Sequence, residues 1–441
     1  MVCEPLGLEY VAGVIGNQHC VKILDMILES SSLETVFKSF KPNIVGFSSL
    51  CIDVENIKVM ASEIKKMAPG IATLVGGTQA FLQPGAFYHE AIDHVFKYTD
   101  SDNLTKVLNC IAANKPIPLI PGVHSRCNDY DVSDTNQHNA FFAPDREATA
   151  EYRHRYSYFG YRPCALLQTS MGCSNTCRFC VRWKIEGALE QDLPVTEVMS
   201  EIRRIKEPHI MIIDNNFLHD HSRIEALCDS LEKEKIHKKF ICYASVKSIV
   251  AHPQSVERFA HNGFCAAIVG FESFKSSELD TYKKKTSVED NDKARQILKN
   301  NQVDCWGSFI LHPDWDKNDF KKFRKYMKEL QPEVSTFSPL TPFPDTPLYR
   351  EYQTRLLNPS THGTGLDFAS IAVRPSQMSI RAYHREIIKC NLYLSLRYSS
   401  SSYLLRRFGI VSTIRLCWFS FKLLIKYVHF PFQQTSVSGN G

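Results

Sequence analysis

Six short apolar runs, separated by charged helical segments, follow one another between residues 165 and 337 of the chain. Residues 195–206, 223–235 and 290–299 are among the helical segments between them. Strands that alternate with helices in this way predict β/α units with a parallel sheet. Six such units make a partial TIM barrel, whose active site lies at the C-terminal ends of the strands. We expect the six strands at residues 165–169, 209–213, 240–244, 266–270, 305–310 and 334–337.

The beginning of the chain repeats this alternation on a smaller scale. Buried parallel strands are expected at residues 19–24, 44–48, 72–77 and 94–98, and residues 54–67 carry apolar side chains at helical spacing. This pattern predicts a doubly wound α/β unit. Such units bind ligands beyond the carboxyl ends of their strands.

Two of these strand ends carry residues that suit a bulky ligand. Ser48-Ser49-Leu50 follows one strand, and Gly76-Gly77 follows the next. Paired glycines let the backbone approach a large ligand closely, and a serine hydroxyl can hold one of its buried polar groups. Ser48, Leu50, Gly76 and Gly77 are therefore candidate ligand-binding residues. The alternative is that they form ordinary turns.

The composition of the 441-residue chain indicates a folded protein with more than one domain. Hydrophobic residues make up 44% and charged residues 22%, which excludes wholesale disorder. Pro, Gly, Asn, Asp and Ser without periodicity indicate a linker between the two α/β regions. We expect an N-terminal α/β domain at 1–125, a linker at 126–158, the barrel at 159–355 and a helical region at 356–441.

The cysteines constrain the chemistry. The first residues carry no basic segment followed by an apolar run, so we expect no signal peptide, a cytoplasmic location and reduced thiols. Most of the 15 cysteines are isolated in apolar stretches and are expected to be small buried hydrophobes. These include Cys51, Cys242, Cys265 and Cys305.

Cys173, Cys177 and Cys180 differ, because they stand in the spacing CxxxCxxC just after the first barrel strand. Three thiolates on one tight loop can hold three irons of a [4Fe–4S] cluster and leave the fourth iron open to a substrate. A structural zinc site is the alternative. Zinc usually takes two pairs of ligands, and no second CxxC or HxxxH lies nearby, so the spacing favours the cluster.

These motifs resemble those of the cobalamin-dependent radical S-adenosylmethionine (SAM) enzymes. The cysteine triad is similar to the cluster motif of that superfamily. The order of Glu4–Tyr10, Ser48-x-Leu50 and Gly76-Gly77 is similar to the cobalamin-binding Rossmann-like domain that precedes the barrel. In that domain a central strand normally comes before the segment matched by Glu4–Tyr10. Since the chain begins almost at that segment, we expect the sheet to lack its first strand.

The resemblance implies a [4Fe–4S] cluster, SAM and cobalamin as cofactors. One electron from the cluster would cleave SAM to a 5′-deoxyadenosyl radical, and a substrate radical would take a methyl group from methylcobalamin. The chain looks most like methylases of unactivated carbon, including those that modify polycyclic lipids. The implied partners are a small-molecule or lipid substrate and an electron donor such as flavodoxin or ferredoxin. The alternatives are a radical SAM cyclase or rearrangement enzyme without methyl transfer, and a non-catalytic cobalamin or membrane-associated sensor.

Polar residues at the ends of the barrel strands are candidates for the SAM site. Asp214, Asn215 and Asn216 follow the second strand and could accept hydrogen bonds from the SAM ammonium group. Glu272 ends the fourth strand, where the family often contacts the ribose or methionine part of SAM. Ser245, after the third strand, is a further candidate for the same pocket.

Two more features lie near the barrel mouth. A lone histidine such as His312 is more often structural than catalytic, so no base is assigned. Residues 340–349 are similar to a Pro-x-Pro-Gly-Thr-Pro-Leu-Tyr segment of the cobalamin-dependent branch, with Asp345 in place of its glycine. Both residue types suit a turn with an unusual backbone angle. A rigid surface turn without a ligand is the alternative interpretation.

The C-terminal tail carries the net charge. The chain has a formal charge of +5, and seven Lys and Arg residues but no acidic residue follow Glu386. An excess of this size predicts no nucleic-acid partner. No uncharged stretch in the tail is long enough to span a bilayer. Residues 403–430 favour either a helix on an anionic membrane surface, hence peripheral contact at the inner membrane, or a helix packed on the barrel. The predicted basic side comprises Arg407, Arg415, Lys422 and Lys426, and the apolar side Leu404, Phe408, Trp418 and Leu423.

Overall fold

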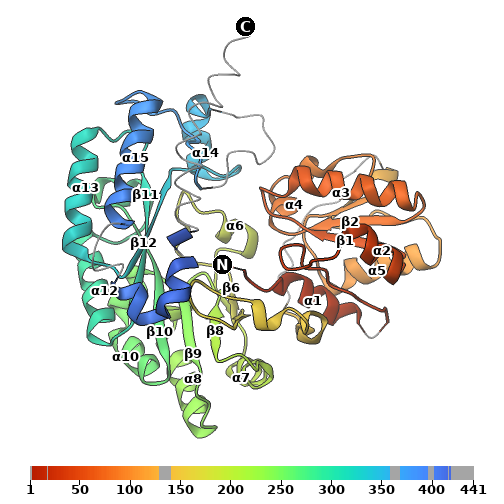
Figure 1. Ribbon diagram of the computed structural model, residues 1–441, viewed down its shortest axis with the longest axis horizontal. Helices are drawn as coiled ribbons and strands as arrows, with labels where there is room; N and C mark the ends of the chain where they lie inside the picture. Colours follow the sequence, from red (N-terminus) through yellow and green to blue (C-terminus); the bar gives the residue numbers. More distant parts are fainter. Residues whose placement is uncertain are drawn as a thin grey trace.

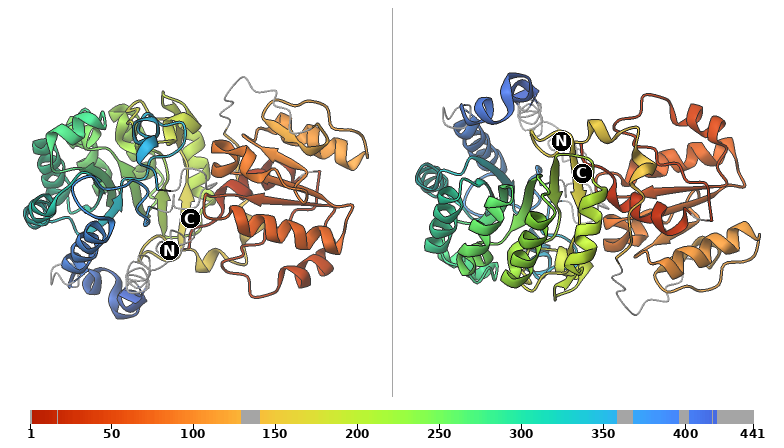
Figure 2. Two further views of the ribbon diagram at one scale, coloured as in Figure 1. Left: turned by 90° about the horizontal axis from the view of Figure 1, so that it is seen from above. Right: turned by 90° about the horizontal axis from the view of Figure 1, so that it is seen from below.

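Two α/β bodies lie side by side in the computed structural model (Figures 1 and 2). The smaller body contains a four-stranded sheet from the first part of the chain, and the larger one a six-stranded sheet. A separate two-stranded sheet belongs to the larger body. The structure describes residues 2–16, 18–128, 141–357, 368–395, 402–415 and 417–418.

The N-terminal body has helices on both faces of its sheet. Its elements are β1 (Ile44–Ser48), β2 (Ala72–Gly76), β3 (His94–Phe96), β4 (Val123–Ser125), α1 (Leu6–Ile15), α2 (Leu33–Phe40), α3 (Val54–Met67), α4 (Thr78–Leu82) and α5 (Ser101–Ala112). The strand order is β1-β2-β3-β4, in which only β4 is antiparallel. Neighbouring residues of a strand point to opposite faces. Val75 therefore packs with α3, and Leu74 packs with α5 and α1. The predicted doubly wound unit and helix 54–67 are confirmed.

The strand predicted at residues 19–24 is wrong. Within the described part of the chain, β1 pairs with β2 alone, so no strand lies beside its other edge. The segment instead leads to Leu28, which packs against Tyr152 and Tyr156, and the Leu28 carbonyl accepts a hydrogen bond from Arg155 at 2.7 Å. An apolar run forms a strand only where a neighbour satisfies its backbone groups. Among the described strands of this sheet, β1 is the first in the chain and lies at one edge.

The larger body is the predicted six-unit partial barrel, and all six strands occur. They are β5 (Cys164–Leu167), β8 (His209–Ile212), β9 (Lys239–Ala244), β10 (Phe264–Glu272), β11 (Asp304–Leu311) and β12 (Val334–Pro339). All are parallel, in the order β12-β11-β10-β9-β8-β5. The helices in its connections lie on the outside of the sheet (Figure 2). They are α7 (Val195–Arg204), α8 (His221–Lys233), α9 (Val246–Ala251), α10 (Pro253–His261), α11 (Ser276–Thr281), α12 (Val288–Asn300) and α13 (Lys317–Leu330).

Shorter elements surround the barrel mouth. The strands β6 (Ser170–Met171) and β7 (Gln191–Asp192) pair in antiparallel fashion and enclose the cysteine loop and α6 (Arg182–Glu186) between them. After the sixth strand come α14 (Pro347–Tyr352) and α15 (Ile380–Ser395). Asp345 has a φ of 64°, as expected for a residue at a glycine position of that turn.

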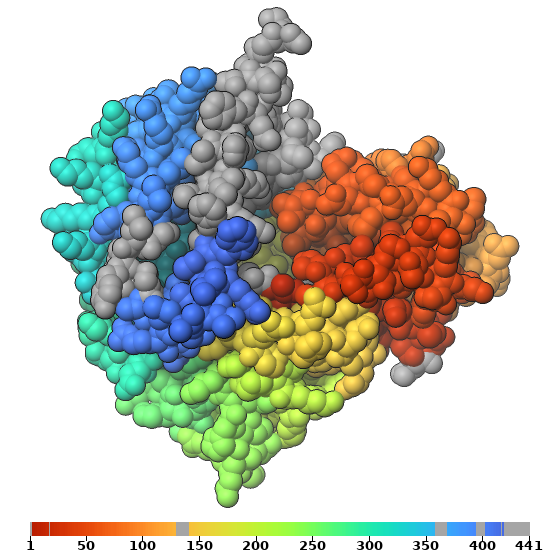
Figure 3. Space-filling model, viewed as in Figure 1, coloured from red at the N-terminus to blue at the C-terminus, as the bar shows by residue number. Residues whose placement is uncertain are grey.

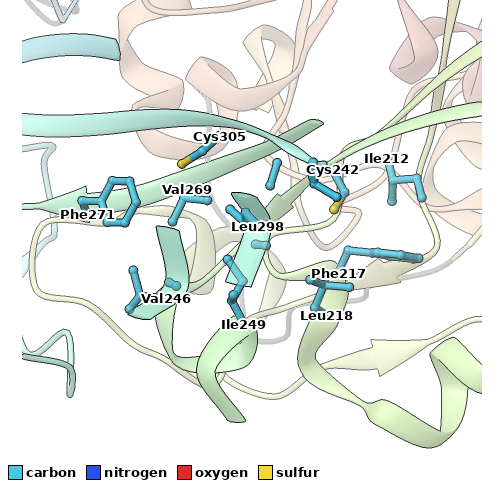
Figure 4. Packing of buried hydrophobic residues seen from close by; sticks show 14 of the residues in the cluster. Ile212, Phe217, Leu218, Cys242, Val246, Ile249, Val269, Phe271, Leu298 and Cys305 are labelled. Atoms are coloured by element: carbon cyan, nitrogen blue, oxygen red, sulfur yellow. The ribbon is translucent and has the colours of Figure 1, made fainter. Parts of the chain in front are cut away.

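The barrel core lies between the outer face of the sheet and its helices (Figure 4). Cys242 and Cys305 face this core and are fully buried beside apolar side chains such as Leu298. Cys265 is also buried, so the interpretation of these three cysteines as small hydrophobes is confirmed. Cys51 is an exception, because it lies half-buried in the loop after β1.

The C-terminal helix, residues 402–415, lies on the face of the molecule shown in Figure 3 and contacts residues at the N-terminal ends of the barrel strands β10 and β11. The Tyr403 hydroxyl donates to Asp304 Oδ2 at 2.8 Å, and Arg407 Nε lies 2.9 Å from the same atom. The ring of Phe408 packs edge-on against Tyr161 with centroids 5.2 Å apart. The interpretation as a helix packed on the barrel is therefore correct for these residues.

The remaining residues predicted for the two sides of the tail helix are only partly described by the structure. Arg415 and Trp418 are exposed and Leu404 is half-buried, whereas Lys422, Leu423 and Lys426 lie outside the described residues. None of the described helices has both the length and the hydropathy needed to cross a bilayer.

Candidate functional site

A cavity of about 370 Å³ lies between the two bodies. Its N-terminal wall is formed by the C-terminal ends of β1 to β3, where Ser48, Gly76 and Gly77 line it. Their binding of a ligand stays a prediction. Leu50 does not line it, since its side chain is 54% exposed on the loop after β1. The barrel contributes residues that flank the cysteine loop. These are Gln168, Met171, Arg182, Ile185 and Glu186.

The N-terminal wall of the cavity is unusually open because glycines form part of it. Gly7 and Gly46 both line the cavity, and a Cβ added to either would meet no atom within 4 Å. Bare backbone of this kind accommodates a broad ligand that side chains would exclude. The wall thus fits a large planar group such as the corrin ring of cobalamin.

Ser49, which the sequence did not single out, holds the two predicted loops together. Its hydroxyl donates to the Gly76 carbonyl at 2.7 Å and accepts from the Ala80 backbone N–H at 3.2 Å. Gly77 has a φ of 98°, and a Cβ there would approach the Ser49 nitrogen to 2.7 Å. The adjacent residues Ser48 and Ser49 were the only sequence feature that indicated such a contact. The sequence does not show which of the two hydroxyls bonds to the neighbouring loop.

The cysteine loop is held from its own C-terminal side. The Cys173 N–H donates to the Gly187 carbonyl at 3.0 Å, and Trp183 Nε1 donates to the Cys177 carbonyl at 3.0 Å. Gly172 precedes the loop with a φ of 86°, and a Cβ there would lie 2.0 Å from the Leu189 carbonyl oxygen. The loop therefore depends on glycine at position 172 to close tightly.

Burial raises the pKa of all three thiols of the triad, that of Cys177 to about 11, and Lys284 opposes this shift in each case. Iron binding would release the thiol protons. Among the described residues, no three His, Cys, Asp or Glu side chains converge as ligands of one metal ion. A [4Fe–4S] cluster binds each thiolate through a different iron, so the loop fits a cluster better than mononuclear zinc.

Asp214 is completely buried at the end of β8. Its carboxylate accepts hydrogen bonds from the Thr169 N–H at 2.6 Å, the Thr169 hydroxyl at 2.5 Å and the Ser170 hydroxyl at 2.7 Å. Burial raises the pKa of Asp214, and these donors oppose the shift. Its oxygens therefore organise the turn that leads to the cysteine loop. Contact with SAM remains a prediction.

Asn215 connects the cysteine loop to α6. Its Nδ2 donates to the Gly172 carbonyl at 3.0 Å and to Glu186 Oε2 at 2.6 Å, and its Oδ1 accepts from Arg182 Nε at 3.1 Å. Because Arg182 and Glu186 line the cavity, Asn215 links the loop to the cavity wall.

Asn216 and Ser245 lie together between the ends of β8 and β9. Asn216 Oδ1 accepts from the Ser245 N–H at 3.0 Å, and Asn216 Nδ2 donates to Ser248 Oγ at 2.8 Å. Ser245 caps α9 by accepting from the Ser248 N–H at 3.0 Å. Each predicted residue thus has a local structural partner, and their roles toward SAM stay predictions.

Glu272 ends β10 and forms a buried ion pair. Its Oε1 lies 3.1 Å from Lys284 Nζ, and its φ of 65° turns the side chain out of the regular strand direction. Burial acts to lower the pKa of Lys284, but Glu272, Cys177 and Cys180 together outweigh burial, and the pKa is raised. Sequence reasoning missed Lys284, which lies within the Lys-Lys-Lys run 283–285.

His312 is satisfied by its neighbours, as the structural interpretation predicted. Its Nε2 lies 3.2 Å from the Tyr352 hydroxyl, and its Nδ1 accepts from the Asp314 N–H at 3.2 Å. Burial lowers its pKa, which favours the neutral ring.

Comparison with known proteins agrees with this arrangement. Residues 1–107 match the B12 binding domain, and residues 167–327 match the radical SAM superfamily. The chain is 25% identical to the hopanoid C-3 methylase of Methylococcus capsulatus over 88% of this chain and 75% of that protein. It is 22% identical to the anaerobic magnesium-protoporphyrin IX monomethyl ester cyclase of Rubrivivax gelatinosus over 79% of this chain and 66% of that protein.

Solved structures show the same fold. The cobalamin-dependent SAM radical enzyme OxsB with aqua-cobalamin bound superimposes with a TM-score of 0.70 at 15% identity. The match covers 94% of this chain and 72% of that one. A B12-binding domain implies cobalamin, and a radical SAM domain implies a [4Fe–4S] cluster and SAM. With a B12-binding domain and a radical SAM domain in this order around a shared cavity, the chain is homologous to the hopanoid C-3 methylase and has the domain organisation of the cobalamin-dependent radical SAM enzymes.

Proposed function

We propose that this enzyme methylates an unactivated carbon, with Cys173, Cys177 and Cys180 as the ligands of its cluster. The cavity carries this proposal, because it joins the strand ends of the B12-binding domain to residues that flank the cysteine loop. When bound, cobalamin supplies the methyl group, and the cluster with SAM supplies the radical that activates the substrate. One cavity shared by the B12-binding domain and the residues beside the cysteine loop suits a methyl transfer that requires both cofactors.

The chain's own residues would orient the cofactors and exclude water. Trp183 and Asn215 hold the cysteine loop in place. On the side of α4, Leu82, Val181 and Phe343 form one buried apolar cluster beside the loop. A dry wall next to the radical site protects a reactive intermediate from side reactions.

The partners follow from the chemistry. A radical SAM enzyme needs an electron donor and a small-molecule substrate, and we propose flavodoxin or ferredoxin as the donor. The methylase relative is named for hopanoids, which supports a polycyclic lipid as the substrate class. We propose that the enzyme works in the cytoplasm.

Anaerobic purification with cobalamin supplied, followed by reaction with SAM and dithionite, tests the function. We expect iron–sulfur and corrinoid absorption together with formation of 5′-deoxyadenosine. Cys177→Ala should lose the iron–sulfur absorption and reduce 5′-deoxyadenosine to background. Cys127→Ala, which changes an exposed cysteine, is the matched control and should keep both. A protein with a cluster but without corrinoid contradicts the methylase, and one that forms no 5′-deoxyadenosine contradicts any radical SAM activity.

A cyclase is the second candidate, because the Rubrivivax relative is named as one. It would use the same cluster, so only the products distinguish the two reactions. With methyl-labelled SAM, a methylase transfers the label to its product and a cyclase does not.

We also propose that the exposed side of the C-terminal helix rests on an anionic membrane surface. Ile410, Val411 and Ile414 are 62–68% exposed on this helix, near the exposed Arg406 and Arg415. Apolar and basic side chains on one exposed helix are typical of such contact.

Flotation with phosphatidylglycerol vesicles tests this contact. The double variant Ile410→Asp, Ile414→Asp should lose most of the vesicle-bound fraction. Ile27→Asp, at a 75% exposed isoleucine in the other domain, should not. Equal flotation of both variants, or equal binding to phosphatidylcholine vesicles, contradicts the proposal.

A further inference from the structure

Lys284 places a positive charge beside the cysteine loop, although it comes from the segment after α11. Its Nζ lies 5.9 Å from the ring centroid of Phe179, which directly precedes Cys180 in the loop. Its side chain is 11% exposed, whereas its neighbours Lys283 and Lys285 are exposed. Lys284 is therefore the inward-facing member of the lysine run.

The backbone of β10 is shaped to hold this lysine. The register of β10 with β11 shifts between Gly270 and Glu272, and this bulge turns the Glu272 carboxylate toward Lys284. A Cβ on Gly270 would lie 2.2 Å from Glu272 Oε1 and 3.3 Å from Lys284 Nζ. Gly270 thus leaves the space that the ion pair occupies. A bulge, a glycine and a residue with positive φ together fix the position of one ammonium group.

We propose that the Lys284–Glu272 pair sets the reduction potential of the cluster, with Lys284 raising it and Glu272 limiting the rise. This inference rests on the proposed function, since it requires the cluster on the cysteine triad. Reduction adds one electron, and so one negative charge, to the cluster. A fixed cation stabilises the reduced form more than the oxidised form, and a fixed carboxylate does the opposite. The effect is strong here because both groups are largely shielded from water.

The two partners therefore predict shifts of opposite sign. Lys284→Met should move the midpoint potential of the cluster to more negative values, and Glu272→Gln should move it to more positive values. We expect at least a tenfold change in the ratio of reduced to oxidised cluster for Lys284→Met at a fixed potential, which is about 59 mV for a one-electron couple. Lys284→Arg keeps the charge, so its midpoint potential should stay close to that of the unchanged protein.

Redox titration of the anaerobic holoenzyme with dithionite, followed by electron paramagnetic resonance without SAM, measures these potentials. Lys283→Met and Lys285→Met remove the same charge from exposed neighbours, and they should leave the potential close to that of the unchanged protein. A distorted loop would shift the Lys284 and Glu272 variants in the same direction. That result overturns the inference, as does a Lys284→Met potential equal to those of the two controls.

Two further outcomes separate this inference from the proposed function. An unchanged protein that shows no cluster signal overturns the proposed function. A cluster that is present in Lys284→Met at an unchanged potential, with weakened SAM binding, overturns this inference alone. It would assign the lysine to the SAM carboxylate.

Discussion

His94 is a buried titratable residue in the sheet that supports the cavity. It lies on β3, and its Nδ1 is 2.8 Å from the Ser125 hydroxyl on β4. Burial lowers the pKa of His94 from 6.5 to about 4. As the pH falls from 6.5 to 4, the unfolded chain therefore takes up a proton before the folded chain does. Stability contributed by neutral His94 is present above pH 6.5 and is lost over this range.

We expect His94→Asn to reduce this acid sensitivity, because asparagine can keep the hydrogen bond to Ser125 but does not titrate. In the unchanged protein, His94 should lower the free energy of unfolding by about 3 kcal/mol in total as the pH falls from 6.5 to 4. Urea unfolding at a series of pH values from 4 to 7 measures it. His154→Asn, at an exposed histidine, is the control. The explanation fails if the variant and the unchanged protein lose stability equally between pH 6.5 and 4.

At the scale of elements, the N-terminal segment seals the free edge of β5. Glu4 Oε1 accepts a hydrogen bond from the Leu166 N–H at 2.5 Å, and Arg146 donates to the Leu166 carbonyl at 3.0 Å. The Arg146 and Glu4 side chains also pair with each other at 2.8 Å, in a buried network that includes Glu9 and Arg153. An edge strand leaves backbone groups unpaired, and these two side chains satisfy them.

Arg146→Met should destabilise the protein by about 3–5 kcal/mol, because it leaves two buried carboxylates, Glu4 and Glu9, with Arg153 as their remaining cationic partner. Chemical denaturation measures the loss. The double variant Glu4→Gln, Arg146→Met should lose less than the sum of the single variants, since the two side chains act on one another. Lys106→Met disrupts an exposed pair with Asp102 and should have little effect. Additive losses would mean that the pair does not act as a unit.

At the scale of the molecule, both ends of the described chain close the barrel. The N-terminal segment bonds to the free edge of β5. The C-terminal helix packs at the N-terminal ends of the barrel strands. Gly160 lies so close to Phe408 that a Cβ there would approach the ring to 2.2 Å. The tail is thus part of the fold as well as a source of charge.

Phe408→Ala should reduce the free energy of unfolding by about 1–3 kcal/mol, because it empties a half-buried aromatic contact. Arg407→Met should also destabilise the protein, since Asp304 would lose its partner. Arg406→Met changes an exposed neighbour and is the matched control. Thermal unfolding compares the three. If Phe408→Ala melts like Arg406→Met, the helix does not contribute to the fold as the packing indicates.

The barrel was the easiest part to predict. All six strands were found, because runs such as 240–244 and 305–310 are strongly apolar and are flanked by clear helices. The strand at 19–24 was wrong because strand formation depends on a partner, which local hydropathy does not report. Cys51 was misplaced for a similar reason, since a short run near Leu50 reads as apolar although it forms a loop.

The sequence by itself determined the two α/β bodies and the cysteine triad, because spacing and periodicity are local properties of the chain. The resemblance of its motifs to those of known enzymes indicated the family. The tertiary structure decided which polar atoms meet. Ser49 bonds to the Gly76 carbonyl while its neighbour Ser48 lines the cavity, Arg407 pairs with Asp304, and Lys284 is the one of three adjacent lysines that pairs with Glu272. Such choices depend on burial and on partners more than a hundred residues away or across a bulge, and no local pattern encodes them.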